Sequence, residues 1–167
     1  MKIVVFDDDP TGSQSVYGCP LLLNWKEEII SKAFDIDSPL LFLLANTRSM
    51  SEEDSEKRTR AICKSIKSCF ERKNINFADV LFVSRGDSTL RGHGVLEPEI
   101  LANELGPFDA TFHIPAFLEG GRTTVDGIHL LNDVPVHLSN FASDKIFGYS
   151  TSFLPDWLEQ KSHGTIS

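Results

Sequence analysis

Short apolar runs alternate with longer amphipathic segments through much of the chain. The apolar runs have the length and the β-branched or aromatic content that are typical of buried strands. They are Ile3–Phe6, Cys19–Trp25, Leu40–Ala45, Val80–Val83 and Ala110–Ile114. The segments that place apolar residues at helical spacing are Lys26–Phe34, Ser51–Lys73 and Val95–Leu105. Because strands that alternate with helices indicate βαβ units, the pattern predicts an α/β fold, a three-layer α/β/α arrangement with a mostly parallel sheet.

The last third of the chain follows a different pattern. Gly120–Leu131 combines turn residues with short apolar stretches and predicts a loop with a β-excursion, and Leu154–Lys161 predicts a short terminal helix. Ser162–Ser167 contains a helix stop and residues that could begin another strand. Since no repeat or linker interrupts the sequence, we expect one domain over residues 1–167, apparently truncated from a longer protein.

Charge and composition narrow the class of ligand. Of the 167 residues, 24 are acidic and 16 basic, which gives a net charge of −8. This balance argues against nucleic acid or an anionic membrane surface as the main partner, so an anionic ligand would need a local basic pocket. The first apolar run is too short and too acid-flanked for a signal peptide, and no run reaches the length of a membrane span. We expect a cytoplasmic protein.

The densest polar motif follows the fourth predicted strand. Residues 84–93 read SRGDSTLRGH and combine two guanidinium groups, three hydroxyls, a carboxylate and two glycines. Open α/β sheets bind ligands beyond the carboxyl ends of their strands, and the planar fork of arginine matches a carboxylate or phosphate. The motif therefore predicts a site for an anionic, hydroxylated ligand.

Three other predicted strands also end in polar loops. Asp7, Asp8 and Asp9 follow the first strand, and such adjacent carboxylates need a cation, a basic partner or water. They could accept a proton from a substrate hydroxyl or bind a metal, or form a solvated turn. Asn46–Ser49 follows the third strand and brings Arg48 toward the same edge of the sheet, or only caps a helix. Gly121–Thr124 repeats the arginine and hydroxyl chemistry after the fifth strand.

Four of these segments resemble, in order, the N-terminal domain of the four-carbon acid sugar kinase family. They are Asp8–Gly12, Asn46–Ser49, Asp87–Gly92 and Pro115–Gly127. The resemblance implies a domain that binds a sugar acid such as threonate, erythronate or an oxo form, for phosphorylation by ATP. In that family a separate C-terminal domain binds the nucleotide, and this sequence contains no G-x-x-x-x-G-K-[ST] loop. We expect ATP and Mg²⁺ to bind to a separate domain or chain, and this chain alone to be inactive.

The resemblance also implies roles for individual residues. Asp8 or Asp9 would orient or deprotonate the attacking hydroxyl, and no metal ligands are assigned. The residues expected to bind the substrate are Arg48, Ser49, Arg85, Asp87, Ser88, Thr89, Arg91, Gly92, Arg122 and Thr123. We also expect Asp8, Arg48, Asp87 and Arg91 to converge on one cleft at the carboxyl edge of the sheet.

Two other hypotheses remain open. Asp7-x-Asp9-x-Thr11 fits the nucleophile motif of haloacid-dehalogenase-like, Mg²⁺-dependent phosphatases, with Thr47 as the second hydroxyl and Asp87 as a metal ligand. No second acid stands four residues after Asp87, which counts against this hypothesis. The third hypothesis is a non-catalytic remnant that binds a small acid. Phosphatase activity with Mg²⁺ alone would separate the phosphatase from a kinase.

Overall fold

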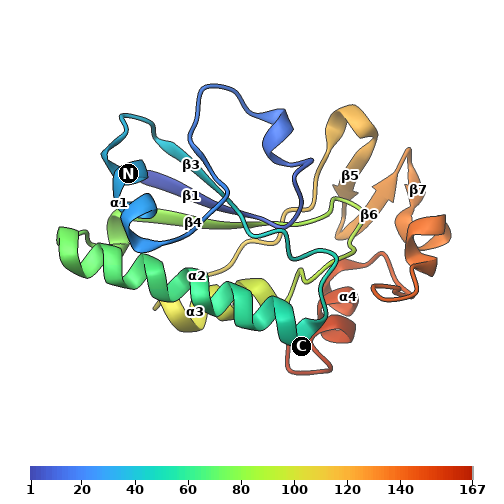
Figure 1. Cartoon of the computed structure of the whole chain (residues 1–167). Coiled ribbons are helices and arrows are strands. Elements are labelled where there is room, and N and C mark those ends of the chain that lie inside the picture. Colours follow the sequence, from blue (N-terminus) through green and yellow to red (C-terminus); the bar gives the residue numbers. More distant parts are fainter. Residues whose placement is uncertain (167) are drawn as a thin grey trace. The chain divides into compact units, whose positions relative to one another are not determined.

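The computed structural model describes residues 1–166, without the side chain of Ser15, and divides the chain into two compact units (Figure 1). The first unit combines Met1–Arg85 with Leu96–Ala110. The second unit combines Gly86–Val95 with the chain from Thr111 onward. Ser167, the last residue of the predicted domain, lies outside the described residues.

The described residues of the first unit form a four-stranded parallel sheet in the order β2-β3-β1-β4. The strands are β1 (Lys2–Asp7), β2 (Leu21–Leu22), β3 (Leu40–Leu44) and β4 (Val80–Arg85). The sequence-based predictions of β1, β3 and β4 are confirmed. Strand β2 is shorter than its apolar run, because Pro20 lacks a backbone N–H and Leu23 turns out to solvent.

Three predicted helices of this unit are also confirmed, as α1 (Glu27–Asp35), α2 (Glu52–Lys73) and α3 (Leu96–Leu105). Helix α2 begins where the sequence indicates, because the Ser51 hydroxyl accepts a hydrogen bond from the Asp54 N–H over 3.2 Å. It ends at Asn74, whose φ of 55° is left-handed.

One face of the sheet carries the helices, and Figure 1 shows α1, α2 and α3 on the same side of the strands. Val4 and Phe6 of β1 point to this side, as alternate residues of a strand must. They pack in one apolar core with residues of the neighbouring strands and of all three helices, including Leu41, Leu43, Ile30, Ala33, Ile62, Ile66, Phe70, Ile100 and Leu101. Burial of this core is the main source of stability of the unit.

The α/β class and the parallel sheet agree with the prediction, but the described helices of the first unit form one layer. The order of the strands gives the reason. From β2 the chain crosses the sheet in one direction to β3 and then to β4, and right-handed crossovers then place successive helices on the same face. The return connection from β1 to β2 contains only the short 3₁₀ turn Ser13–Ser15.

The described residues of the second unit contain a three-stranded antiparallel sheet, β5 (Arg122–Val125), β6 (Ile128–Leu131) and β7 (Val134–Pro135). Asp126 and Gly127 have φ values of 50° and 78°, which the tight turn of a hairpin requires. Helix α4 spans Leu154–Lys161. The predictions of a β-excursion and a terminal helix are thereby confirmed. A small core holds this unit together and contains Leu90, Val95, Val136, Tyr149 and Trp157.

The prediction of a strand at Ala110–Ile114 is wrong. This segment is irregular, and Phe112 and Ile114 are 84% and 77% exposed. An alternating apolar pattern shows which side chains a strand would bury, but a strand forms only where another strand offers hydrogen bonds. No described strand pairs with this segment. No helix in the described part of the chain is both long and apolar enough to cross a membrane.

Candidate ligand-binding site

The three aspartates at the end of β1 differ sharply in exposure. Asp7 and Asp8 are buried, with 0% and 2% of their surface exposed, whereas the Asp9 side chain is 27% exposed. Burial of adjacent carboxylates is costly unless each has a partner. The partners of each aspartate therefore determine what it can do.

Asp8 is held by Arg48 in a two-pronged ion pair. Arg48 donates from Nε to Oδ2 over 2.9 Å and from Nη2 to Oδ1 over 2.7 Å. The Arg48 backbone N–H also donates to the Asp8 carbonyl over 3.1 Å. Such a fork fixes the orientation of both groups. The geometry favours a role for Asp8 in positioning Arg48, and the predicted catalytic role of Asp8 stays a prediction.

Asp9 is the carboxylate that solvent can reach. Its Oδ1 accepts hydrogen bonds from the Thr11 hydroxyl at 2.5 Å and from the Thr11 N–H at 2.9 Å. The hydrogen bond from the Thr11 hydroxyl is the main reason that the pKa of Asp9 is lowered. Asp9 is therefore ionised at neutral pH, and it can accept a hydrogen bond from a ligand hydroxyl.

Asp7 pairs with Arg85 beneath a tight loop. Arg85 Nη1 donates to Asp7 Oδ1 over 3.2 Å, while Asp7 Oδ2 is buried without a hydrogen-bond partner among the described residues. Burial raises the pKa of Asp7. A Cβ at Gly12 would lie 2.1 Å from Asp7 Oδ1 and 2.3 Å from Arg85 Nη1. Only glycine lets this loop close over the ion pair.

The second unit holds another carboxylate–guanidinium pair, within the loop of residues 86–95. Asp87 accepts hydrogen bonds from the Thr89 hydroxyl at 2.5 Å and from Arg91 Nε at 2.6 Å. Burial alone would raise the pKa of Asp87, but these hydrogen bonds outweigh it and lower the pKa. Leu90 and Gly92 have left-handed φ values of 65° and 88°, which fold the loop back on itself. The loop is therefore built around an ionised Asp87.

Two guanidinium groups of the second unit gather at one aromatic ring. Arg91 Cζ lies 4.8 Å from the centroid of the Phe141 ring, and Arg122 Cζ lies 6.0 Å from the same centroid. Arg122 also lies over Phe117, at 5.3 Å. The Arg122 Nε is buried without a hydrogen-bond partner among the described residues. In a chain of net charge −8, this cluster is a local cationic site suited to a carboxylate.

Two residues to which the sequence assigned no role support the loop of residues 86–95. His129 is fully buried, and its Nε2 lies 2.7 Å from the Ser88 carbonyl oxygen, so Nε2 must carry the proton. Its Nδ1 then accepts from the Thr124 hydroxyl at 2.9 Å. Burial lowers the pKa of His129 and keeps it neutral. Tyr149 donates its hydroxyl to the Thr89 carbonyl over 2.7 Å.

The described structure brings some predicted site residues together within each unit. Asp8, Asp9 and Arg48 form one group in the first unit, where Arg85 joins Asp7 instead. Ser49 is exposed in the turn that follows β3. In the second unit the predicted residues lie in the loop of residues 86–95 and at the start of β5, and they are Asp87, Ser88, Thr89, Arg91, Gly92, Arg122 and Thr123. The convergence of both groups on one cleft stays a prediction.

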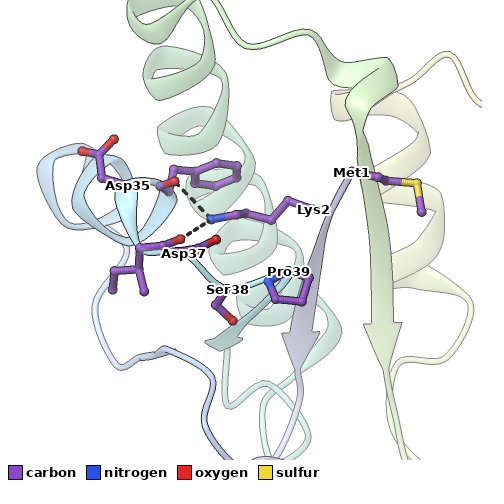
Figure 2. Close-up of a pocket in the computed structure, with 8 residues that line it drawn as sticks. Met1, Lys2, Asp35, Asp37, Ser38 and Pro39 are labelled. Atoms are coloured by element: carbon purple, nitrogen blue, oxygen red, sulfur yellow. Dashed lines mark hydrogen bonds between the residues drawn. The ribbon is translucent and has the colours of Figure 1, made fainter.

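The pocket in Figure 2 lies at the opposite end of the first unit's strands. It is formed by residues 1–2 and 34–39. Lys2 Nζ donates to the carbonyls of Phe34 and Ile36 over 3.1 and 3.0 Å, and it lies 5.2 Å from the Phe34 ring. The ammonium group is thus already bound by the chain itself, at the amino ends of the strands. Ligands of α/β sheets bind at the carboxyl ends, so this pocket is not the candidate site.

These features define an α/β domain whose strand ends and loops carry charged pairs suited to a small anionic ligand. The chain belongs to the family of sugar-binding N-terminal domains, whose family model matches residues 3–167.

Comparisons with individual proteins agree with this assignment. A D-erythronate kinase from Heliobacterium modesticaldum is 23% identical across 86% of this chain and 32% of its own length. A domain of unknown function from Bordetella bronchiseptica, solved as a domain-swapped dimer with bound citrate, has a TM-score of 0.70 at 22% identity, over 94% of this chain and 40% of that chain. A Haemophilus influenzae protein has a TM-score of 0.69 at 15% identity, over 96% of this chain and 38% of that chain. The chain spans less than half of each of these proteins.

Proposed function

We propose that this chain is the sugar-acid-binding part of an ATP-dependent kinase that phosphorylates four-carbon sugar acids such as erythronate or threonate. Membership of the sugar-binding family supports the class of ligand. The relative named as a D-erythronate kinase supports the reaction and the four-carbon acid. The citrate in the Bordetella structure supports an acidic ligand, because citrate is itself a hydroxy acid.

The pair of guanidinium groups at Phe141 is the observation that carries this proposal. Arg122 keeps a buried Nε that has no partner in the described part of the chain, and a buried donor without an acceptor costs free energy. Arg122 is only half-buried as a whole, so the Nη groups of its guanidinium would bind a ligand carboxylate together with the charge of Arg91. In this proposal Arg91 and Arg122 bind the carboxylate, and the hydroxyls of Ser88 and Thr123 bind those of the sugar acid. The predicted ligand contact of Thr89 is not part of it, because Thr89 is 1% exposed and its hydroxyl donates to Asp87.

The chemistry that this chain would supply is orientation and proton acceptance. Asp9 is ionised and accessible, so it can accept a hydrogen bond from the attacking hydroxyl and take its proton as the bond to phosphorus forms. Arg48, fixed by Asp8, adds positive charge beside Asp9, with its Nη1 at 3.7 Å from Asp9 Oδ2. Phosphoryl transfer depends mainly on such positioning and charge stabilisation.

The proposed reaction also needs ATP and Mg²⁺, and the proposal does not place their binding sites on the described residues. ATP would supply the phosphoryl group, and Mg²⁺ would neutralise the charge of its phosphates. Among the described residues no group of three or more His, Cys, Asp or Glu side chains is arranged to hold a metal ion. As the resemblance to the sugar-acid kinase family implies, the proposal assigns both to a separate nucleotide-binding domain or chain.

The burial of Asp7 argues against the phosphatase hypothesis. A nucleophilic aspartate must bring a carboxylate oxygen against a phosphorus atom. Asp7 is 0% exposed, with one oxygen held by Arg85 and the other enclosed. Assay of the chain with Mg²⁺ and a phosphate ester tests this directly, and we expect no phosphate release.

The proposed function is tested by comparing two ligands of the same carbon count. D-erythronate carries a carboxylate and erythritol does not. We expect calorimetric titration to detect binding of D-erythronate to this chain and none of erythritol. Equal responses to the two ligands would contradict a carboxylate site. Continuous ATP consumption that depends on D-erythronate, with this chain alone, would contradict the assignment of nucleotide binding to another domain or chain.

A further inference from the structure

Glu97 of α3 is a carboxyl group buried in the core of the first unit, with 4% of its surface exposed. Hydroxyls from three separate segments donate to it. Thr47, in the loop after β3, makes a short hydrogen bond to Oε1. Ser55 of α2 donates to Oε1 over 3.4 Å, and Ser84 of β4 donates to Oε2 over 3.3 Å. One side chain thus joins α3, α2, β4 and the loop after β3.

Burial of a carboxyl group costs free energy that a purely structural contact would not require. Burial, helped by the charge of Asp8, opposes the ionised form and raises the pKa of Glu97 to about 7, although the donating hydroxyls act to lower it. An apolar side chain at the same place would avoid that cost, because apolar replacements of buried charged groups are often neutral or stabilising. The position therefore calls for a role that an apolar residue could not fill.

Thr47 links Glu97 to the candidate site. Thr47 immediately precedes Arg48, whose guanidinium holds Asp8 and lies beside Asp9. The surrounding backbone is also fixed, since Arg48 N–H donates to the Asp8 carbonyl over 3.1 Å and Met50 N–H donates to the Thr47 carbonyl over 2.9 Å. A fixed Thr47 side chain therefore restricts where Arg48 can lie. The Thr47 side chain is fully buried, and its hydroxyl donates a hydrogen bond to the Glu97 carboxyl group.

We propose that Glu97 is a positioning residue, which holds Thr47 so that Arg48 and its partner carboxylates keep the geometry needed to bind the sugar acid. The effect on ligand binding rests on the proposed function. The effect on the loop of residues 46–50 does not, because it concerns contacts within the first unit alone. The two effects can therefore be measured separately.

The test compares three variants with a matched control. Glu97→Ala removes the acceptor, Thr47→Val removes the donor with little change of shape, and Glu97→Gln keeps an acceptor oxygen for Thr47. Glu99→Gln is the control, since Glu99 is an exposed carboxylate on the same helix. Hydrogen exchange of the Arg48 and Met50 amides reports on the loop. Calorimetric titration with D-erythronate, normalised to folded protein, reports on binding.

We expect Thr47→Val and Glu97→Ala each to speed exchange at these two amides and to weaken D-erythronate binding by about threefold or more, as for residues that share one network. The double variant should be no weaker than either single variant, because both changes remove the same contact. Glu97→Gln should restore both readouts toward wild type, and Glu99→Gln should leave them unchanged. If Glu97→Ala fails to fold, Thr47→Val alone decides the outcome.

Unchanged exchange at both amides in Thr47→Val would overturn the proposal, whatever the ligand does. Faster exchange with unchanged affinity would overturn the link to binding and leave Glu97 a structural residue. If wild-type protein shows no response to D-erythronate, the proposed function fails, while the exchange data still decide whether Glu97 fixes the Arg48 loop.

Discussion

Arg91 donates from Nε to Oδ2 of Asp87 over 2.6 Å, and the same guanidinium lies 4.8 Å from the ring of Phe141. One edge of the guanidinium is thus used within the loop. Its Nη1 lies at the longer distance of 4.0 Å from Asp144 Oδ2. Arg91 could therefore hold the loop, bind the ligand, or do both, and the sequence alone does not distinguish these roles.

The first prediction concerns the substitution Arg91→Lys. Lysine keeps the charge but loses the planar fork, so a ligand carboxylate would lose a charge-assisted hydrogen bond. Such bonds contribute about 1.5–3 kcal/mol, so we expect D-erythronate to bind about tenfold more weakly. Arg72→Lys is the control, because Arg72 lies on the surface of the first unit and pairs there with Glu27. Calorimetric titration and melting curves of both variants provide the measurement. A lowered melting temperature with unchanged affinity would show that Arg91 only holds the loop.

The second prediction concerns the substitution Gly12→Ala. The added Cβ would lie 2.1 Å from Asp7 Oδ1 and 2.3 Å from Arg85 Nη1, so the loop or the ion pair must move. We expect a loss of about 1–3 kcal/mol in the free energy of unfolding, as for other overpacked sites. Gly86→Ala is the matched control, since no atom of the described residues lies within 4 Å of a Cβ there. Urea unfolding of the two variants gives the comparison. Equal stabilities would contradict the close contact of Gly12 with the Asp7–Arg85 pair.

The third prediction concerns the pH dependence of stability. Burial raises the pKa of Glu97 from 4.5 to about 7 in the folded chain. Between these values the folded state keeps a proton that the unfolded state has lost, so stability falls as the pH rises from 4.5 to 7. The loss due to this group is about 3 kcal/mol. Below pH 4.5 and above pH 7 its contribution is constant.

Glu97→Gln removes this titration while keeping the side chain's size. Wild type should lose more free energy of unfolding than the variant when the pH rises from 5 to 8. Urea unfolding of both proteins at the two pH values measures this difference. Glu99→Gln again serves as the control. Parallel pH profiles of Glu97→Gln and wild type would contradict a buried, titrating Glu97.

Much of the first unit could be predicted from the sequence because its signals are local. The strands β1, β3 and β4 are continuous apolar runs, and α2 begins with a hydroxyl cap at Ser51. The segment Ala110–Ile114 carries an equally clear apolar pattern and forms no strand in the described structure. Pairing with a partner strand is a non-local condition that no pattern within a segment reveals.

The residues of the candidate site that follow strands could be predicted from the sequence, because that signal is also local. The residues that depend on distant partners could not. Parallel strands end at a common edge, which led to Asp8, Asp9 and Arg48. Glu97 was missed because its position in an amphipathic helix resembles that of a solvated residue, and its burial depends on hydroxyls far away in the sequence. Phe141 was missed because a lone aromatic residue gives no sign of the arginines that it will meet.

The most direct test of the central claim, a carboxylate site built on Arg91 and Arg122, is calorimetric titration of D-erythronate into wild type and Arg122→Gln. The buried Arg122 Nε lacks a partner among the described residues, so the loss of this guanidinium should cost binding more than it costs folding. We predict measurable binding to wild type, and a fall in affinity of about tenfold or more in Arg122→Gln, which corresponds to about 1.4 kcal/mol or more. Equal affinities in the two proteins, or no binding to wild type, would contradict the account.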